Sequence, residues 1–260
     1  MQAQKLIVIG GGGGPMAGVE LHKKIIQNTL NGGTDQGHLE VLHLSRSHDI
    51  ADRTAFLLGR SRVDPAEGMF RTMQIAARAA EVAGKEAVAG IPCSTFHAPA
   101  IFTHFMQLME AGGIGMKVVH MIEETAGLIP QLAPNARKIG VMSTAGTRAA
   151  RVYNGALEPR GYQIVEVPED MAAKLHDSIH NVEWGVKAVS PVSARARANF
   201  ERYVGVLRER GAEAVVLGCT EIPLALPESE FDGIPLIDPM LALARALIRE
   251  ADGARLRPLE

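Results

Sequence analysis

Cysteine and aromatic residues are scarce in this chain, whose 260 residues contain only two cysteines and one tryptophan. No apolar run in the sequence approaches the length of about eighteen residues that a membrane span needs. The apolar run closest to the N-terminus, residues 6–9, is shorter than the core of a signal peptide. We therefore expect a cytoplasmic protein without a membrane partner. In that compartment both cysteines stay reduced, which leaves them available as thiols.

The chain also lacks a large excess of charge of either sign. The chain has 27 Lys and Arg against 29 Asp and Glu, a net charge of −2, and no basic cluster. No nucleic-acid partner is therefore expected. The 47% of hydrophobic and 22% of charged residues are typical of a globular protein. A chain of this length buries about 75% of its unfolded surface, enough for one large core or two small ones.

The two cysteines stand in similar surroundings. Each follows an apolar run and precedes a hydroxyl residue, in IPCST (residues 91–95) and in LGCTE (residues 217–221). This pattern predicts that Cys93 and Cys219 lie where a buried strand ends, which is the usual place for active-site residues in open α/β sheets.

The similarity extends beyond the cysteines. Cys93 and Cys219 lie 126 residues apart, and a second matching pair, KLIVIG at residues 5–10 and KIGVM at 138–142, lies 133 residues apart. Two matches at nearly the same offset indicate an internal duplication, with two units of similar topology.

The apolar pattern alternates between strands and helices, which predicts two similar open parallel sheets with helices on both faces and the active site in the cleft between them. The strands are expected at residues 5–10, 39–45, 86–92, 117–121, 138–142, 162–167 and 213–218. We expect residues 1–115 and 226–260 to form the first domain and residues 116–225 the second. A capped helix over 238–251 returns to the first domain.

Six segments, in order along nearly the whole chain, resemble the cofactor-independent aspartate/glutamate racemases, and aspartate racemase most. They are GGGPMA (12–17), DRTA (52–55), IPCSTFH (91–97), HMIEE (120–124), GVKA (185–188) and LGCTEIPL (217–224). Ser94 and Phe96 depart from the usual family pattern, so the resemblance leaves aspartate, glutamate and a broader set of amino acids open as substrates.

The resemblance implies racemisation by two thiols, with neither pyridoxal phosphate nor a metal. Cys93 and Cys219 would act on opposite faces of the substrate Cα, one as thiolate and one as thiol. Both forms can exist near neutral pH because a free thiol has a pKa of about 8.5 that nearby cations lower. A lone cysteine is more often a buried small hydrophobe, and a disulfide or metal site is the remaining alternative.

The resemblance also implies a dicarboxylic amino acid as the substrate and a homodimer as the assembly. Arg53 and Lys187 would bind the carboxylates, since a guanidinium matches them with two parallel hydrogen bonds. The hydroxyl residues expected to bind the substrate are Thr54, Ser94, Thr95, Thr147 and Thr220. N-capping of helices is the alternative role for such hydroxyls. Glu221 either orients the cysteine loop or caps a helix.

Other functions stay open at this point. Broad-specificity amino-acid racemase, hydantoin racemase, maleate isomerase and arylmalonate decarboxylase share the superfamily and its cysteine loop. Residues 12–17 also fit the relaxed glycine fingerprint of an NAD-type oxidoreductase, but the next strand ends at 43–45 in His-Leu-Ser, without the acid that holds a ribose. A ligand-binding protein without turnover would not need two matched thiols.

Overall fold

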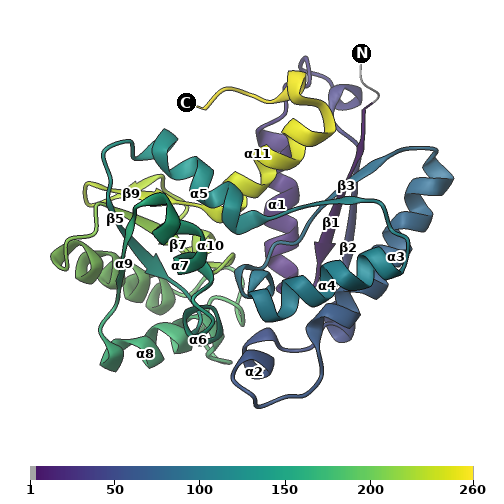
Figure 1. The fold of residues 1–260 in the computed structure, drawn as a ribbon. Helices are drawn as coiled ribbons and strands as arrows, with labels where there is room; N and C mark the ends of the chain where they lie inside the picture. The colour runs from purple at the N-terminus through teal and green to yellow at the C-terminus, as the bar shows by residue number, and fades with distance from the viewer. Residues whose placement is uncertain (1–3, 260) are drawn as a thin grey trace.

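The strands form two separate parallel sheets in the computed structural model, which describes residues 4–259 (Figure 1). The first sheet has the spatial order β2 (Val41–Ser45), β1 (Leu6–Gly11), β3 (Ala87–Gly90), β4 (Lys117–Val119). The second has the order β6 (Gln163–Glu166), β5 (Lys138–Met142), β7 (Ala214–Leu217), β9 (Ile234–Ile237), β8 (Glu230–Phe231). Only the pairing of β8 with β9 is antiparallel among the described strands.

Helices cover both faces of each sheet. They are α1 (Pro15–Gln27), α2 (Arg53–Leu57), α3 (Pro65–Ala83), α4 (Pro99–Ala111), α5 (Met121–Leu132), α6 (Ala145–Ala149), α7 (Val152–Leu157), α8 (Glu169–His180), α9 (Ala194–Glu209), α10 (Ile222–Ala225) and α11 (Pro239–Asp252). Several begin with proline, whose missing N–H costs nothing at the first helical position. Alternate residues of β1 enter different cores, since Ile7 packs with residues of α1 and α11 and Val8 with residues of α3 and α4.

The two sheets have equivalent topologies, as the repeated sequence predicts. The order β2-β1-β3-β4 corresponds to β6-β5-β7-β9, so β3 and β7 occupy matching positions. All seven strands expected from the sequence are present, and the predicted fold class is confirmed. Because Cys93 follows β3 and Cys219 follows β7, the two cysteines lie at equivalent sheet edges.

Each sheet with the helices that cover it forms one half of the molecule. Strand pairing corrects the predicted boundaries between these two halves. Lys117–Val119, assigned to the second domain, pairs with β3 of the first sheet. Ile234–Ile237, assigned to the first domain, pairs with β7 of the second. Strands after residue 226 were not predicted, because proline at 235 and glycine at 233 are typical of turns rather than sheets. The chain therefore crosses between the sheets after β4 and after β9.

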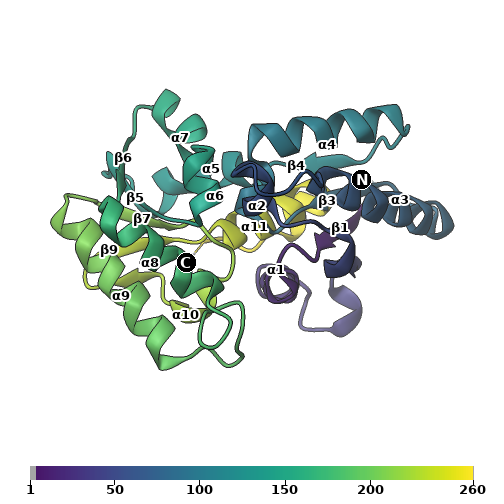
Figure 2. The same ribbon diagram turned by 90° about the horizontal axis from the view of Figure 1, so that it is seen from below.

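The last helix returns to the first sheet, as predicted. Asp238 caps α11 by accepting a hydrogen bond from the Met240 amide at 2.8 Å. Leu243 and Leu247 pack so closely on β3 that a Cβ at Gly90 would lie 2.8 Å from the Leu247 side chain. Figure 2 shows α11 at the junction of the two halves. In the described part of the chain, no helix is both long and apolar enough to cross a membrane.

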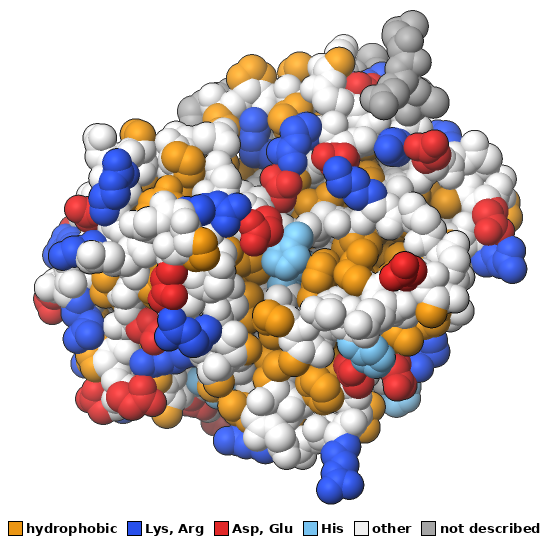
Figure 3. Space-filling model, in the orientation of Figure 1, with side chains coloured by type: hydrophobic (Ala, Val, Ile, Leu, Met, Phe, Trp, Pro, Cys, Tyr) orange, Lys and Arg blue, Asp and Glu red, His pale blue; other side chains and the backbone are white. Residues whose placement is uncertain are grey.

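The surface carries charges of both signs. Figure 3 shows Lys and Arg interspersed with Asp and Glu over one face, without a large field of a single sign. The expected absence of a nucleic-acid partner stays a prediction.

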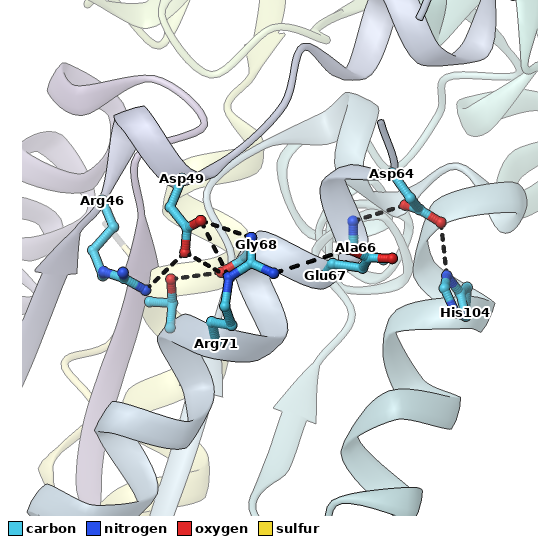
Figure 4. A network of polar contacts seen from close by, with 9 residues as sticks. Arg46, Asp49, Asp64, Ala66, Glu67, Gly68, Arg71 and His104 are labelled. Atoms are coloured by element: carbon cyan, nitrogen blue, oxygen red, sulfur yellow. Dashed lines mark hydrogen bonds and ion pairs between the residues drawn. The ribbon is translucent and has the colours of Figure 1, made fainter. Parts of the chain in front are cut away.

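The segment before α2 is braced against α3 (Figure 4). The Asp49 carboxylate pairs with Arg46 at 3.0 Å and with Arg71 at 2.6 Å. A Cβ on Gly68 would lie only 1.9 Å from the Asp49 carbonyl oxygen, so glycine permits the close approach of helix and loop. This contact fixes the path of the chain four residues before Arg53.

Gly68→Ala is therefore expected to destabilise the fold. The methyl group meets backbone that cannot move cheaply, and such overpacking costs about 1–3 kcal/mol. Chemical denaturation measures the free energy of unfolding. Gly127→Ala is the control, because Gly127 is exposed within α5 with nothing near its Cβ position, and alanine there should stabilise by up to ~1 kcal/mol. Equal stabilities for the two variants would contradict the assigned contact.

Candidate active site

The two cysteines line one small cavity between the halves. Cys93 and Cys219 are both free, with 8% and 5% of their surface exposed. The cavity has a volume of about 20 Å³, room for about one water molecule. Of the ten residues predicted for the site, nine line it: Arg53, Thr54, Cys93, Ser94, Thr95, Lys187, Cys219, Thr220 and Glu221. The tenth residue, Thr147, does not line the cavity but forms a hydrogen bond with Thr95, which does.

Cys219 lies beside a buried carboxylate. Its Sγ donates a hydrogen bond to Glu221 Oε2 at 3.2 Å, and Thr220 Oγ1 donates to the same oxygen at 3.1 Å. The other oxygen, Oε1, forms an ion pair with Lys187 Nζ. Burial alone would raise the pKa of Glu221, but the Lys187 charge and these hydrogen bonds hold it below its usual value. Glu221 is therefore a carboxylate at neutral pH.

The pKa of Cys219 is raised, first by burial and second by the Glu221 charge. Lys187 acts in the opposite direction but does not compensate for both influences. Cys219 is therefore a thiol that donates its hydrogen to Glu221.

Cys93 lies beside a cation instead. A Cβ placed on Gly13 would be 3.4 Å from Cys93 Sγ and 3.8 Å from Arg53 Cζ, so both groups reach the same point of the glycine loop. Arg53 Nη1 donates to the Ala51 carbonyl at 3.1 Å, and Nη2 donates to the Gly13 carbonyl. Its Nε is buried and, among the described residues, has no partner. Burial would lower the pKa of Arg53, but Cys93, Asp52 and Glu221 raise it, so Arg53 stays charged.

The glycine-rich loop forms one wall of the cavity. Gly12 has a φ of +104°, a conformation that favours glycine. A Cβ on Gly14 would overlap the Glu221 carboxylate, 1.6 Å from Oε1. The glycines thus let the backbone reach the two cysteine loops. Because Cys93 and Glu221 fill the space beside the loop, it has no room for the pyrophosphate of a dinucleotide.

The hydroxyl residues join the two halves across the cavity. Ser94 Oγ hydrogen bonds to the phenol of Tyr153 at 2.9 Å, and Thr95 Oγ1 to Thr147 Oγ1 at 2.8 Å. Thr144 completes the cluster at 3.2 Å from Thr95 and also caps α6. These contacts hold the strand ends of the two sheets together.

Asp52, Thr144 and His180 also line the cavity, and of these Asp52 and His180 were not predicted from the sequence as site residues. His180 Nδ1 is buried without a hydrogen-bond partner in the described structure. Burial, His176 and Lys187 lower the pKa of His180 to about 4, so its ring is neutral at pH 7. The spacing of His176 and His180, one helical turn apart and just before the lysine motif, was the available signal.

The sequence profile of the Asp/Glu/Hydantoin racemase family matches residues 11–247, and the chain belongs to this family. Picrophilus torridus aspartate racemase has a similar structure, with a TM-score of 0.76, 26% identity and coverage of 97% of this chain and 96% of that one. This likeness supports the predicted resemblance, and it argues against the oxidoreductase alternative.

Curated glutamate racemases match over a shorter region. The enzyme from Beutenbergia cavernae is 29% identical over 160 residues, which cover 55% of this chain and 50% of that protein. That from Synechococcus sp. (strain CC9605) is 26% identical over 146 residues, covering 52% and 48%. The match therefore spans about half the length of these relatives.

His97 supports the first cysteine loop from behind. Its Nδ1 lies 2.9 Å from the Cys93 carbonyl oxygen, and its Nε2 accepts a hydrogen bond from the Met121 amide at 3.3 Å. Nε2 as acceptor requires the proton on Nδ1, which then donates to Cys93. Burial, with a contribution from His120, lowers the pKa of His97 to about 3. The neutral ring thus fixes the Cys93 backbone to the start of α5.

This lowered pKa predicts acid sensitivity. Unfolded histidine has a pKa near 6.5, so between pH ~6.5 and ~3 the unfolded state binds a proton that folded His97 does not. The contribution of His97 to the free energy of unfolding is constant above pH ~6.5. Below pH ~6.5 the free energy of unfolding falls by up to about 1.4 kcal/mol per pH unit because of His97. Denaturation measured from pH 7 to 4 should show a shallower fall in His97→Asn, whereas His48→Asn, at an exposed position, should match wild type. A wild-type slope in His97→Asn would contradict this account.

Proposed function

We propose that this protein is a cofactor-independent amino-acid racemase that acts on aspartate or glutamate. The observation that carries the proposal is that two free thiols, from equivalent strand ends, line one cavity with two largely buried cations, Arg53 and Lys187. The two thiols supply the acid and the base that inversion at Cα requires.

The reaction is a double proton transfer. One cysteine thiolate takes the Cα proton from one face of the substrate, while the other thiol delivers its proton to the opposite face. The negative charge that develops on Cα spreads into the α-carboxylate, and fixed donors around that carboxylate stabilise it. Each turnover exchanges the protonation states of Cys93 and Cys219, and the reverse reaction uses the opposite arrangement.

Carboxylate binding falls to the two cations. Arg53 Nε has no partner in the described structure, so this N–H is free to donate to a substrate oxygen. Lys187 is already paired with Glu221, and a substrate carboxylate would share or replace that contact. A cavity of about 20 Å³ is too small for an amino acid, so binding requires the halves to separate slightly.

The homodimer remains a prediction.

The test is incubation of the purified protein with single L-amino acids in D₂O, followed by chiral separation and mass analysis. We expect aspartate or glutamate to yield the D-enantiomer with one deuterium at Cα. Cys93→Ser and Cys219→Ser should each lower kcat/KM by about a hundredfold or more, the usual contribution of a general acid or base.

Circular dichroism of both variants is the control for folding. A folded variant that keeps more than about a tenth of the wild-type kcat/KM would show that its cysteine is not an essential proton carrier. Absence of exchange with every amino acid would instead favour the isomerase or decarboxylase branch of the superfamily.

Arg53→Lys is expected to weaken the binding of dicarboxylic substrates. Lysine keeps the charge but loses the planar fork, so KM for the preferred substrate should rise at least tenfold, about 1.4 kcal/mol. Initial rates of racemisation measure KM and kcat. Arg78→Lys, at a surface position with 82% of its side chain exposed, is the matched control. Unchanged KM and kcat in Arg53→Lys would remove Arg53 from the substrate site.

A further inference from the structure

The two thiols have neighbours of opposite charge. Their loops differ two residues after the cysteine, where Thr95 follows Cys93 and Glu221 follows Cys219. Cys219 Sγ lies 3.2 Å from a Glu221 carboxylate oxygen, to which it donates. Cys93 Sγ and the Arg53 guanidinium both approach Gly13, at 3.4 and 3.8 Å from its Cβ position. A carboxylate favours the neutral form of a thiol, and a guanidinium favours the thiolate. The cavity is therefore electrically asymmetric.

Glu221 is held where it acts on Cys219. It has only 2% of its side chain exposed, and its two oxygens are divided between Lys187 on one side and Thr220 with Cys219 on the other. Gly14 closes the remaining side, because any larger residue there would overlap Oε1. The carboxylate cannot turn away from the thiol without leaving both its ion pair and its hydrogen bonds.

The other charged and titratable groups near the thiols do not remove this difference. Lys187 interacts electrostatically with both cysteines, and so does Tyr153, whose pKa is raised by burial so that it stays neutral. His180 is neutral at pH 7 because of its lowered pKa. Asp52 also lines the cavity, and its carboxylate interacts with Arg53. Arg53 beside Cys93 and Glu221 beside Cys219 therefore remain as the groups that distinguish the two thiols.

Building on the proposed function, we infer that Glu221 is a positioning residue that keeps Cys219 protonated in the resting enzyme, so that Cys93 is the resting thiolate and the first base. Cys93 takes the Cα proton of one enantiomer, and Cys219 gives its own proton to the other face. This leaves Cys93 as thiol and Cys219 as thiolate next to the Glu221 carboxylate. That second form is the less stable one, and it returns to the resting form by releasing the Cys93 proton and regaining one on Cys219.

The experiment measures each thiol without any substrate. Cysteine labelled with ¹³C at Cβ is introduced into Cys219→Ser, which retains Cys93, and into Cys93→Ser, which retains Cys219. NMR titration then follows each thiol directly, because the Cβ resonance moves when the thiol ionises. At a given pH we expect the larger thiolate fraction in the variant that retains Cys93. Adding Glu221→Gln to Cys93→Ser should lower the pKa of Cys219 by more than about one unit, a tenfold change in thiolate fraction.

Glu228→Gln is the control, since it removes a surface carboxylate from the same segment of the chain and should leave the pKa of Cys219 unchanged. If the variant that retains Cys219 shows the larger thiolate fraction, or if Glu221→Gln does not lower the pKa of Cys219, the inference is wrong.

A second measurement uses the protein with both cysteines, in case a single-cysteine variant does not fold. Limited alkylation with iodoacetamide and peptide mapping should modify Cys93 first, since both thiols share one cavity and the thiolate reacts. Glu221→Gln should raise the relative rate at Cys219, and faster modification of Cys219 in the unmutated protein would overturn the inference. Neither readout needs turnover, so a protein that shows this order but racemises no amino acid would contradict the proposed function alone.

Discussion

The ion pair between Lys187 and Glu221 is the interaction on which the site depends. A buried carboxylate is tolerated only when it is paired and hydrogen bonded, and removal of one partner of such a pair costs about 3–5 kcal/mol. Here the pair ties together chain segments that are 34 residues apart, and Gly14 from the other half closes over it. The Thr220 hydroxyl also lies 3.2 Å from the Pro92 carbonyl oxygen, so its one proton is shared between this carbonyl and Glu221 and links the halves. The same contacts that satisfy the charge therefore align the two cysteine loops.

Much of this arrangement could be predicted from the sequence. The repeated pattern of apolar run, cysteine and hydroxyl placed Cys93 and Cys219 at equivalent strand ends, because parallel strands of alike sequence end at alike edges. The short strand at 234–237 was missed since proline and glycine hid it, and the second crossover was consequently placed too early. Phe96 departs from the usual family pattern but packs on Phe105 in the core, with ring centroids 5.3 Å apart, and does not line the cavity.

The difference between the two thiols is only partly visible in the local sequence. Glu221 stands two residues after Cys219, at the position that Thr95 holds after Cys93. The other groups come from elsewhere, since Arg53 lies 40 residues before Cys93 and Lys187 reaches Glu221 from a loop after α8. Tertiary contacts of this kind set pKa values through burial and neighbouring charge, neither of which a motif specifies. An active site built from a duplicated fold can thus place unlike chemical environments at equivalent positions.

The central claim is that two separate groups act on opposite faces of Cα. The most direct test follows one enantiopure substrate that carries deuterium at Cα during the first turnovers in ordinary water. If two thiols act, the product enantiomer will have lost its deuterium to solvent, while the recovered starting enantiomer keeps its label. Product that retains the label, or early loss of label from the starting enantiomer, would indicate a single base and contradict the account.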